Sequence, residues 1–242
     1  MSWSLWKIPL IITNATGIHI AYTPPNPIPN ADELHQYGSR NSDLTLLFKL
    51  RRHAAIVAKG IHWAFASCES LVILAYAFPS THSQPILTTL LHRAENASAV
   101  RVTPQNVVGC ALVVAGVGIR LACQRELGRF FTWEKSVKKD QQLVTSGPYA
   151  VVRHPSYTGM LLATVGTLLC HLGPGNWLLQ SSLLESPWTK GLVVLWIAYS
   201  AGLPCVMFFR TFDEDRVLRA HFPEQWDAYA KRVPYRLVPY IF

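Results

Sequence analysis

Long apolar segments alternate with polar segments along the chain of 242 residues. A helix that crosses the hydrocarbon core of a bilayer needs about 20 mostly apolar residues. Five segments reach or approach this length, at residues 3–22, 54–78, 104–123, 157–172 and 188–209. The pattern therefore predicts an all-α fold, a polytopic membrane helix bundle with about five transmembrane helices.

The first segment is the weakest of the five. Lys7, Asn14 and His19 interrupt it, so it could be a tilted span or an interfacial helix. It lacks the short basic start and the small-residue cleavage site of a removable signal peptide, which favours a retained membrane segment. The second segment contains three residues that are costly in lipid and should face other helices: Lys59, His62 and Glu69.

The third segment opens with Pro104, which suits a helix start because its missing N–H would have no partner there. Between Gly109 and Gly118 the segment is rich in glycine and alanine. Small residues allow helices in a bilayer to approach closely. We therefore expect this face to contact a neighbouring helix or to leave room for another molecule.

The composition supports a membrane protein. Charged residues make up 15% of the chain, against about 25% in ordinary soluble domains, and the mean hydropathy is +0.19. The formal charge is +8, and basic residues cluster before the second, after the third and after the fifth apolar segments, whereas residues 173–187 contain no Lys or Arg. With five spans this is the positive-inside pattern, which predicts a cytosolic C-terminus.

Other function classes receive little support. No basic helix or aromatic-interleaved basic patch stands apart from the apolar segments, which argues against nucleic-acid binding. The five cysteines lie within or at the ends of apolar runs, and none forms a CxxC motif or pairs with a histidine at metal spacing. Small apolar packing residues are the favoured interpretation, so we expect neither disulfides nor a metal site.

The first of two polar blocks spans residues 143–159. Gly147 and Pro148 form a turn that directs Tyr149, because proline fixes its φ and glycine permits an unusual one. Pro155 then begins the fourth apolar segment, where N–H groups at a helix start can meet a polar or anionic ligand. Tyrosine and arginine also anchor proteins at the headgroup level. The residues alone favour neither a binding site nor an anchor.

The second polar block spans residues 210–229. Arg210 and Glu214 are four residues apart, so on a helix they share a face and could simply pair. Apolar and aromatic residues recur at helical spacing, which favours an amphipathic tail; they are Leu218, Phe222, Trp226 and Tyr229. Both blocks fall on the predicted cytosolic side, so we expect them to form a single site.

Together the blocks resemble a known family. The pattern GPY-x4-HPSYTG, followed by R-x3-E-D-x2-L-x3-F-x3-W-x2-Y-x3-VP and a final VPYIF, is similar to the isoprenylcysteine carboxyl methyltransferases, part of a wider group of integral-membrane methyltransferases that includes phospholipid N-methyltransferases. The resemblance is specific over residues 116–242, while residues 1–100 match only in having membrane segments. It implies one integral-membrane methyltransferase domain over residues 1–242, with its catalytic core at 116–242.

The resemblance implies that S-adenosylmethionine binds on the cytosolic side, in a pocket formed by the loop before the fourth helix and the C-terminal tail. Arg210 matches the arginine that faces the methyl-accepting carboxylate and is the candidate catalytic and substrate-binding residue. Asp215 matches the second acid of an acidic pair, usually Glu. The candidate cofactor-binding residues are Gln141, Gln142, Leu143, Val144, Tyr149, His154, Pro155, Ser156, Tyr157 and Glu214.

Two departures from the family pattern affect the cofactor site. Gln141 stands where prenylcysteine members usually have His, but its amide can still donate and accept hydrogen bonds. Glu134 aligns with an upstream polar cofactor contact that is often Gln. The site therefore remains compatible with the cofactor, with Glu134 as the least secure position.

The implied reaction is methyl transfer to the C-terminal carboxylate of a prenylated cysteine, giving a methyl ester. That carboxylate has a pKa of about 3.5 and is already ionised, so no general base is needed. The implied partners are prenylated, CAAX-processed proteins or a small prenylcysteine-like substrate, and the lipid bilayer. The prenyl chain would enter between spans, where the Gly109–Gly118 face could leave room. By family resemblance the membrane is that of the endoplasmic reticulum, with the active site cytosolic.

Two alternatives remain open. The first is a membrane methyltransferase that acts on a phospholipid amine or another lipid, because both polar blocks would serve the cofactor in either case. The second is a non-catalytic membrane scaffold that retains the fold, although the presence of Arg210, Glu214, His154 and Tyr157 argues against it.

Overall fold

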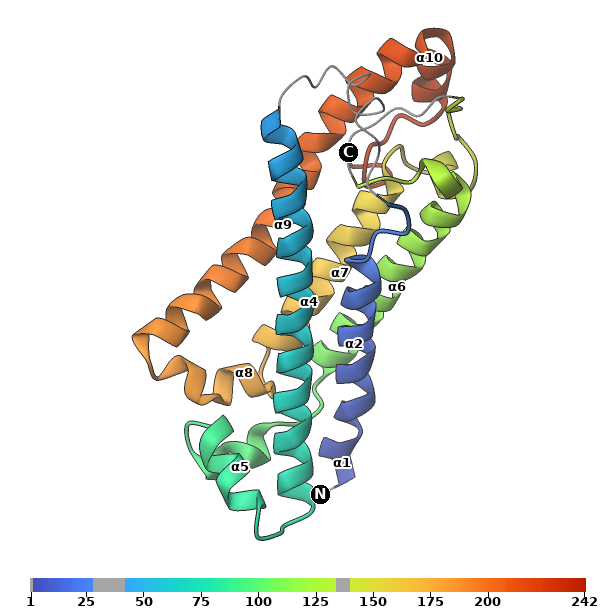
Figure 1. The fold of residues 1–242 in the computed structure, drawn as a ribbon. Coiled ribbons are helices and arrows are strands. Elements are labelled where there is room, and N and C mark those ends of the chain that lie inside the picture. Colours follow the sequence, from blue (N-terminus) through green and yellow to red (C-terminus); the bar gives the residue numbers. More distant parts are fainter. Residues whose placement is uncertain (1, 28–41, 134–139) are drawn as a thin grey trace. The chain divides into compact units, whose positions relative to one another are not determined.

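The computed structural model describes residues 2–27, 42–133 and 140–242, and Figure 1 shows that long helices dominate them. The described residues form no strand, and one isolated bridge joins Leu91 to Ser181. The predicted all-α fold is confirmed. The helices are α1 (Ser2–Leu5), α2 (Lys7–Ala21), α4 (Ser42–Ala77), α5 (Ser83–Leu90), α6 (Pro104–Leu127), α7 (Pro155–Leu172), α8 (Trp177–Gln180), α9 (Pro187–His221) and α10 (Pro223–Arg232), with short 3-10 turns at Ala94–Ala99, Gly128–Phe130, Gly147–Ala150 and Ser182–Leu184.

Three helical segments of the described chain are long and apolar enough to cross a membrane: Leu50–Ala77, Pro104–Phe130 and Pro187–His221. They correspond to the second, third and fifth predicted segments, so the prediction of a membrane helix bundle is confirmed. Helices α2 and α7 lie in the first and fourth predicted segments, with 15 and 18 residues. Both helices are shorter than the length of about 20 residues that usually crosses a bilayer. The number of five spans therefore stays a prediction.

The helix starts follow from local chemistry. Helices α6, α7, α9 and α10 all begin with proline, whose fixed φ suits the first turn and whose missing N–H costs nothing there. At the start of α6, Asn106 accepts a bond from the Thr103 N–H at 3.0 Å, and the Thr103 hydroxyl accepts one from the Asn106 N–H at 3.4 Å. This reciprocal pair satisfies backbone donors that the helix leaves open.

The chain divides into two compact units, each built from three separate stretches. The first unit comprises the residues up to Ile20, Val57–Ala115 and Leu162–Leu203. The second comprises Ala21–Ile56, Gly116–Leu161 and Pro204–Phe242. Helices α4, α6, α7 and α9 each contribute residues to both units.

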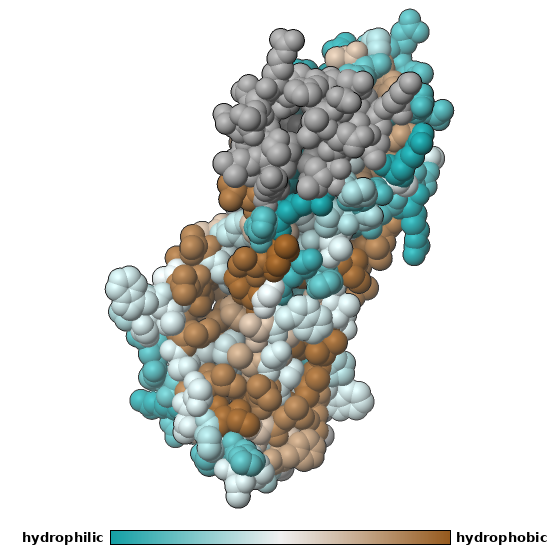
Figure 2. Space-filling model, in the orientation of Figure 1, coloured by the Kyte–Doolittle hydropathy of each residue, from teal (hydrophilic) through white to brown (hydrophobic). Residues whose placement is uncertain are grey.

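The first unit has an aromatic core and an apolar outer surface. Phe65, Trp177 and Trp196 are buried in it, with ring centroids of Phe65 and Trp196 5.2 Å apart. Figure 2 shows broad apolar areas on the molecular surface, and the exposed side chains of α4 and α9 include Leu74 and Leu192. Apolar residues both inside and outside are expected of helices that face lipid.

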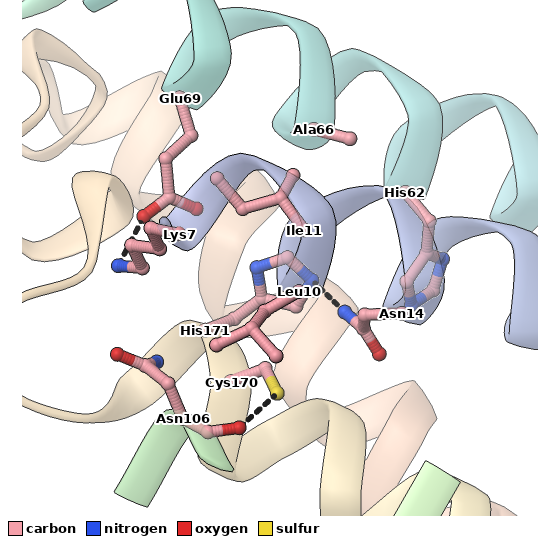
Figure 3. A pocket seen from close by; sticks show the side chains of 10 residues that line it. All are labelled: Lys7, Leu10, Ile11, Asn14, His62, Ala66, Glu69, Asn106, Cys170 and His171. Carbon is pink, nitrogen blue, oxygen red and sulfur yellow. Dashed lines mark hydrogen bonds and ion pairs between the residues drawn. The ribbon is translucent and has the colours of Figure 1, made fainter. Parts of the chain in front are cut away.

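Polar residues are nevertheless buried inside the first unit (Figure 3). The Lys7 ammonium lies 2.5 Å from a Glu69 carboxylate oxygen and donates to the Asn176 side-chain oxygen at 2.7 Å and to the Gly175 carbonyl at 2.6 Å. Asn14 lies 3.2 Å from His171 in the same group. The prediction that Glu69 faces another helix is thus confirmed, and its partner is the lysine that weakens the first segment.

Helices α6 and α7 approach closely at two glycine pairs. In the first unit, a Cβ built on Gly166 would lie 2.4 Å from the Gly109 carbonyl oxygen. In the second unit, a Cβ on Gly159 would lie 2.5 Å from the Gly116 carbonyl oxygen. The expected close packing of small residues is confirmed. The alternative that this face leaves room for a prenyl chain is wrong at Gly109 and Gly116, because the backbone of α7 fills those positions.

Candidate functional site

The turn before α7 is shaped as the sequence predicts. Gly147 has φ +57°, a conformation that favours glycine, and Pro148 follows it in the 3-10 turn Gly147–Ala150. The turn places Tyr149 in a buried cluster with Cys123 and Phe131. The Tyr149 carbonyl accepts a hydrogen bond from the Tyr229 hydroxyl at 2.8 Å. Gly147 and Pro148 therefore join the loop to α10 through Tyr149.

The start of α7 is joined to the C-terminal tail through backbone atoms. The Arg153 N–H donates to the Tyr235 carbonyl at 2.9 Å, and the His154 N–H donates to the Arg236 carbonyl at 2.8 Å. The N–H groups of Tyr157 and Thr158 donate to the His154 carbonyl. These two donors are therefore engaged within the protein. That other N–H groups at this helix start meet a ligand stays a prediction.

The polar end of α9 meets α7 at a shared carboxylate. One Glu214 oxygen accepts hydrogen bonds from the Arg210 Nε, at 2.7 Å, and from the Tyr157 hydroxyl. The other oxygen lies 3.5 Å from the His154 Nδ1. Arg210 also donates to the Trp133 carbonyl at 2.8 Å. The Glu214 side chain is 22% exposed, more than that of the neighbouring Asp215, at 9%.

Asp215 is surrounded by cations. One of its oxygens lies 2.7 Å from the His154 Nε2, and the other accepts from Arg153 at 2.9 Å and from Arg236 at 2.7 Å. Burial by itself would lower the pKa of His154, but the hydrogen bonds and negative charges of Asp215 and Glu214 outweigh burial and raise that pKa above 6.5. The two carboxylates therefore favour the charged form of His154 more strongly than water favours that of an exposed histidine.

Besides His154, the second unit contains a buried cation that was not predicted from the sequence, Arg120 on α6. Its side chain is 4% exposed and donates to the Ser156 hydroxyl at 2.9 Å and to the Ser156 carbonyl. Its guanidinium lies over the Phe131 ring, 5.7 Å from the centroid. Its Nε has no hydrogen-bond partner among the residues that the structure describes. An arginine inside an otherwise apolar segment was the available signal, because such residues are rare in membrane helices and often functional.

The remaining predicted residues occupy other parts of the second unit. Leu143 packs against the cluster of Trp226 and Tyr229, and Val144 packs against the Tyr149 cluster. Pro155 is buried as the first residue of α7, Gln141 is partly buried and Gln142 is exposed. Glu134 lies outside the described residues. Arg210, Glu214, Tyr157 and His154 are thus brought together, while Leu143 and Val144 contribute to the surrounding packing.

The arrangement suits a small molecule that carries positive charge and hydroxyl groups. Glu214 supplies a carboxylate, Tyr157 a hydroxyl, and Arg210 a planar fork that binds carboxylates well. S-adenosylmethionine has a cationic amino group, a sulfonium and ribose hydroxyls, so this set of donors and acceptors fits it. No group of three or more His, Cys, Asp or Glu side chains suited to a metal ion occurs among the described residues.

The fold and the site define an integral membrane protein with features of a methyltransferase. The chain belongs to the phospholipid methyltransferase family, whose profile matches residues 104–225. This match includes Arg120, the loop before α7, and the Arg210–Asp215 stretch, but not the C-terminal segment that contacts Arg153 and His154.

Relatives of known name agree with this membership. The chain is 29% identical over 128 residues to protein-S-isoprenylcysteine O-methyltransferase B of Arabidopsis thaliana, covering 52% of this chain and 55% of the relative. It is 33% identical over 121 residues to the protein-S-isoprenylcysteine O-methyltransferase of Schizosaccharomyces pombe, covering 49% and 43%. The chain spans about half the length of the curated relatives it matches.

Other relatives have different names. A Delta(14)-sterol reductase of Mus musculus is 32% identical over 103 residues, which cover 42% of this chain and 20% of the reductase. The shared segment therefore occurs in proteins named for different reactions. Similarity over this segment alone therefore does not identify the reaction, and the side chains of this chain's own site are needed to distinguish the possible reactions.

Proposed function

We propose that this protein transfers a methyl group from S-adenosylmethionine to the C-terminal carboxylate of a prenylated cysteine. One observation carries the proposal: Glu214 is bonded to Arg210 and Tyr157 and lies beside His154, in the segment where the chain matches its family. The relatives named as isoprenylcysteine methyltransferases support the same reaction.

S-adenosylmethionine, when bound, supplies an electrophilic methyl group. In the proposed mechanism Glu214 holds the cationic part of this donor, with Tyr157 and His154 fixing the carboxylate. Arg210 orients the acceptor carboxylate through its guanidinium. The acceptor is already ionised near neutral pH, so the residues need to hold two reactants in attack geometry and exclude water.

Arg210 and Glu214 are hydrogen-bonded to each other, which adds a requirement. For Arg210 to bind the substrate carboxylate, its guanidinium must either present N–H donors other than the Nε–H that Glu214 accepts or give up that bond. Arg120 supplies a buried positive charge in the same unit, and its Nε, which has no hydrogen-bond partner among the described residues, supports an anionic group as part of the natural substrate. We propose that the site faces the cytosol, at the endoplasmic reticulum membrane, and that the acceptor is a prenylated, CAAX-processed protein or a small prenylcysteine-like molecule.

The test uses the full chain in membranes with methyl-labelled S-adenosylmethionine. N-acetyl-farnesylcysteine should yield a base-labile methyl ester. Arg210→Ala should lose methyl transfer while it retains most cofactor binding, and Glu214→Ala should lose cofactor binding. Equal loss of cofactor binding in both variants would contradict this division of roles.

A phospholipid amine is the second candidate acceptor, and the family match supports it. Base-stable label in phosphatidylethanolamine vesicles, with none in the prenylcysteine, would favour this alternative. If wild-type protein fails to bind S-adenosylmethionine at all, a non-catalytic scaffold becomes the better explanation.

A further inference from the structure

Asp215 is fully engaged inside the protein. Both of its carboxylate oxygens accept short hydrogen bonds, one from His154 and the other from Arg153 and Arg236. The side chain is 9% exposed. A ligand could reach this carboxylate only by replacing those bonds. Asp215 therefore differs from its neighbour Glu214, whose side chain is 22% exposed.

His154 connects the two acids. Its Nε2 lies 2.7 Å from Asp215, and its Nδ1 lies 3.5 Å from Glu214. A neutral imidazole carries a proton on one ring nitrogen only, whereas the imidazolium donates from both. Two carboxylates on opposite sides of the ring therefore favour the imidazolium. The charged and titratable groups around His154 are Asp215, Glu214, Arg153, Arg210, Arg236 and Tyr157.

The tail holds this arrangement in place. Arg236 binds Asp215 through its side chain and accepts the His154 N–H through its carbonyl. The Thr158 hydroxyl donates to the Leu237 carbonyl at 2.6 Å. His154 is therefore fixed by its ring on one side and by its backbone on the other, which leaves the position of its Nδ1 well defined.

We propose that Asp215 is a positioning residue: it keeps His154 doubly protonated, so that the Nδ1–H faces Glu214 and holds that carboxylate in place for the cofactor. This inference rests on the proposed function for the identity of the cofactor. It assigns Asp215 a role different from the direct cofactor contact that an acidic pair suggests. The raised pKa of His154 agrees with it.

The first test measures cofactor affinity against pH, with the full chain in lipid nanodiscs and S-adenosylmethionine as the ligand. Wild-type affinity should vary little between pH 6 and 8. Asp215→Asn should bind about tenfold more weakly at pH 8, the usual effect of losing one hydrogen bond to a charged group, and the loss should shrink toward pH 6, where solvent protonates His154. Asp215→Glu should recover part of the affinity.

Asp213→Asn is the matched control, because Asp213 is two residues away on α9 and its side chain is 51% exposed. It should reproduce the wild-type pH profile. Equal pH profiles for Asp215→Asn and the wild type would overturn the inference, even if Asp215→Asn binds more weakly overall, because a purely structural defect would lower affinity at every pH.

A second measurement needs no cofactor. NMR of histidine-labelled protein, with the His154 signal assigned from His154→Gln, should show that His154 titrates at lower pH in Asp215→Asn than in the wild type. An unchanged titration would refute the role of Asp215. If the wild type failed to bind S-adenosylmethionine but the titration shifted as expected, the proposed function would fail and the positioning role would stand.

Discussion

Replacing Lys7 by methionine should destabilise the first unit strongly. Lys7 is 2% exposed and forms three contacts of 2.5–2.7 Å with Glu69, Asn176 and the Gly175 carbonyl. Methionine keeps a similar chain length but removes the charge and all three donors. Glu69, which is 3% exposed, would keep the Trp177 N–H as its donor, at 3.2 Å.

The magnitude follows from that uncompensated carboxylate. Breaking a buried ion pair by removing one partner costs about 3–5 kcal/mol, while replacing both partners by apolar residues is often close to neutral. Hydrogen bonds inside membrane proteins average only about 0.6 kcal/mol, so most of the effect should come from the charge. We expect about 3 kcal/mol for Lys7→Met, with at least half of it recovered in Lys7→Met/Glu69→Gln.

The assay is equilibrium unfolding in mixed micelles, followed by circular dichroism. Lys190→Met is the control, because Lys190 is exposed in the same unit and should change the free energy of unfolding by less than about 0.5 kcal/mol. The reasoning would be refuted if Lys7→Met matched Lys190→Met, or if the double variant were less stable than Lys7→Met alone.

Two further predictions concern packing and pH. Gly166→Ala should lower the free energy of unfolding by about 1–3 kcal/mol, the usual cost of overpacking, because its Cβ would lie 2.4 Å from the Gly109 carbonyl oxygen. Gly202→Ala is the control, because a Cβ there would meet nothing within 4 Å. It should instead raise the free energy of unfolding by up to about 1 kcal/mol through helix propensity. The folded-state pKa of His154 is raised above its ordinary 6.5, so its stabilising contribution is complete below about pH 6.5 and is lost as pH rises through the raised pKa. The stability difference between wild type and His154→Gln should therefore shrink with increasing pH, and a difference that grows would contradict the assignment.

Apolar length and local spacing made the main elements predictable. The segments at 54–78, 104–123 and 188–209 are helices, because runs of this length satisfy the backbone of a membrane span. The i,i+4 spacing of Arg210 and Glu214 predicted their pairing, which occurs on α9. The helical ends were harder: α4 begins at Ser42 and α9 continues to His221, because charged residues extend a helix beyond the apolar core.

Contacts between distant residues could not be predicted in this way. Lys7 and Glu69 are 62 residues apart. Considered alone, each is a charged residue that is unfavourable in an apolar membrane segment, and nothing in the sequence indicates that they form a pair. Asp215 has partners on both sides in sequence, at Arg153 and Arg236, and no spacing rule connects them. The resemblance matched Asp215 to the second acid of an acidic pair, and only the geometry shows that its oxygens are hydrogen-bonded within the protein.

The joining of α7, α9 and the tail has a consequence for biosynthesis. His154 and Asp215 are 61 residues apart, and Arg236 follows 21 residues after Asp215. At synthesis rates of about 5–20 residues per second, about 3–12 s pass between the synthesis of His154 and that of Asp215. More time passes before Arg236, whose carbonyl accepts the His154 N–H, is synthesised. During that interval the start of α7 lacks the partners that Asp215 and Arg236 supply to His154. The contacts of the proposed methyl-transfer site therefore cannot be complete until Arg236 has been synthesised.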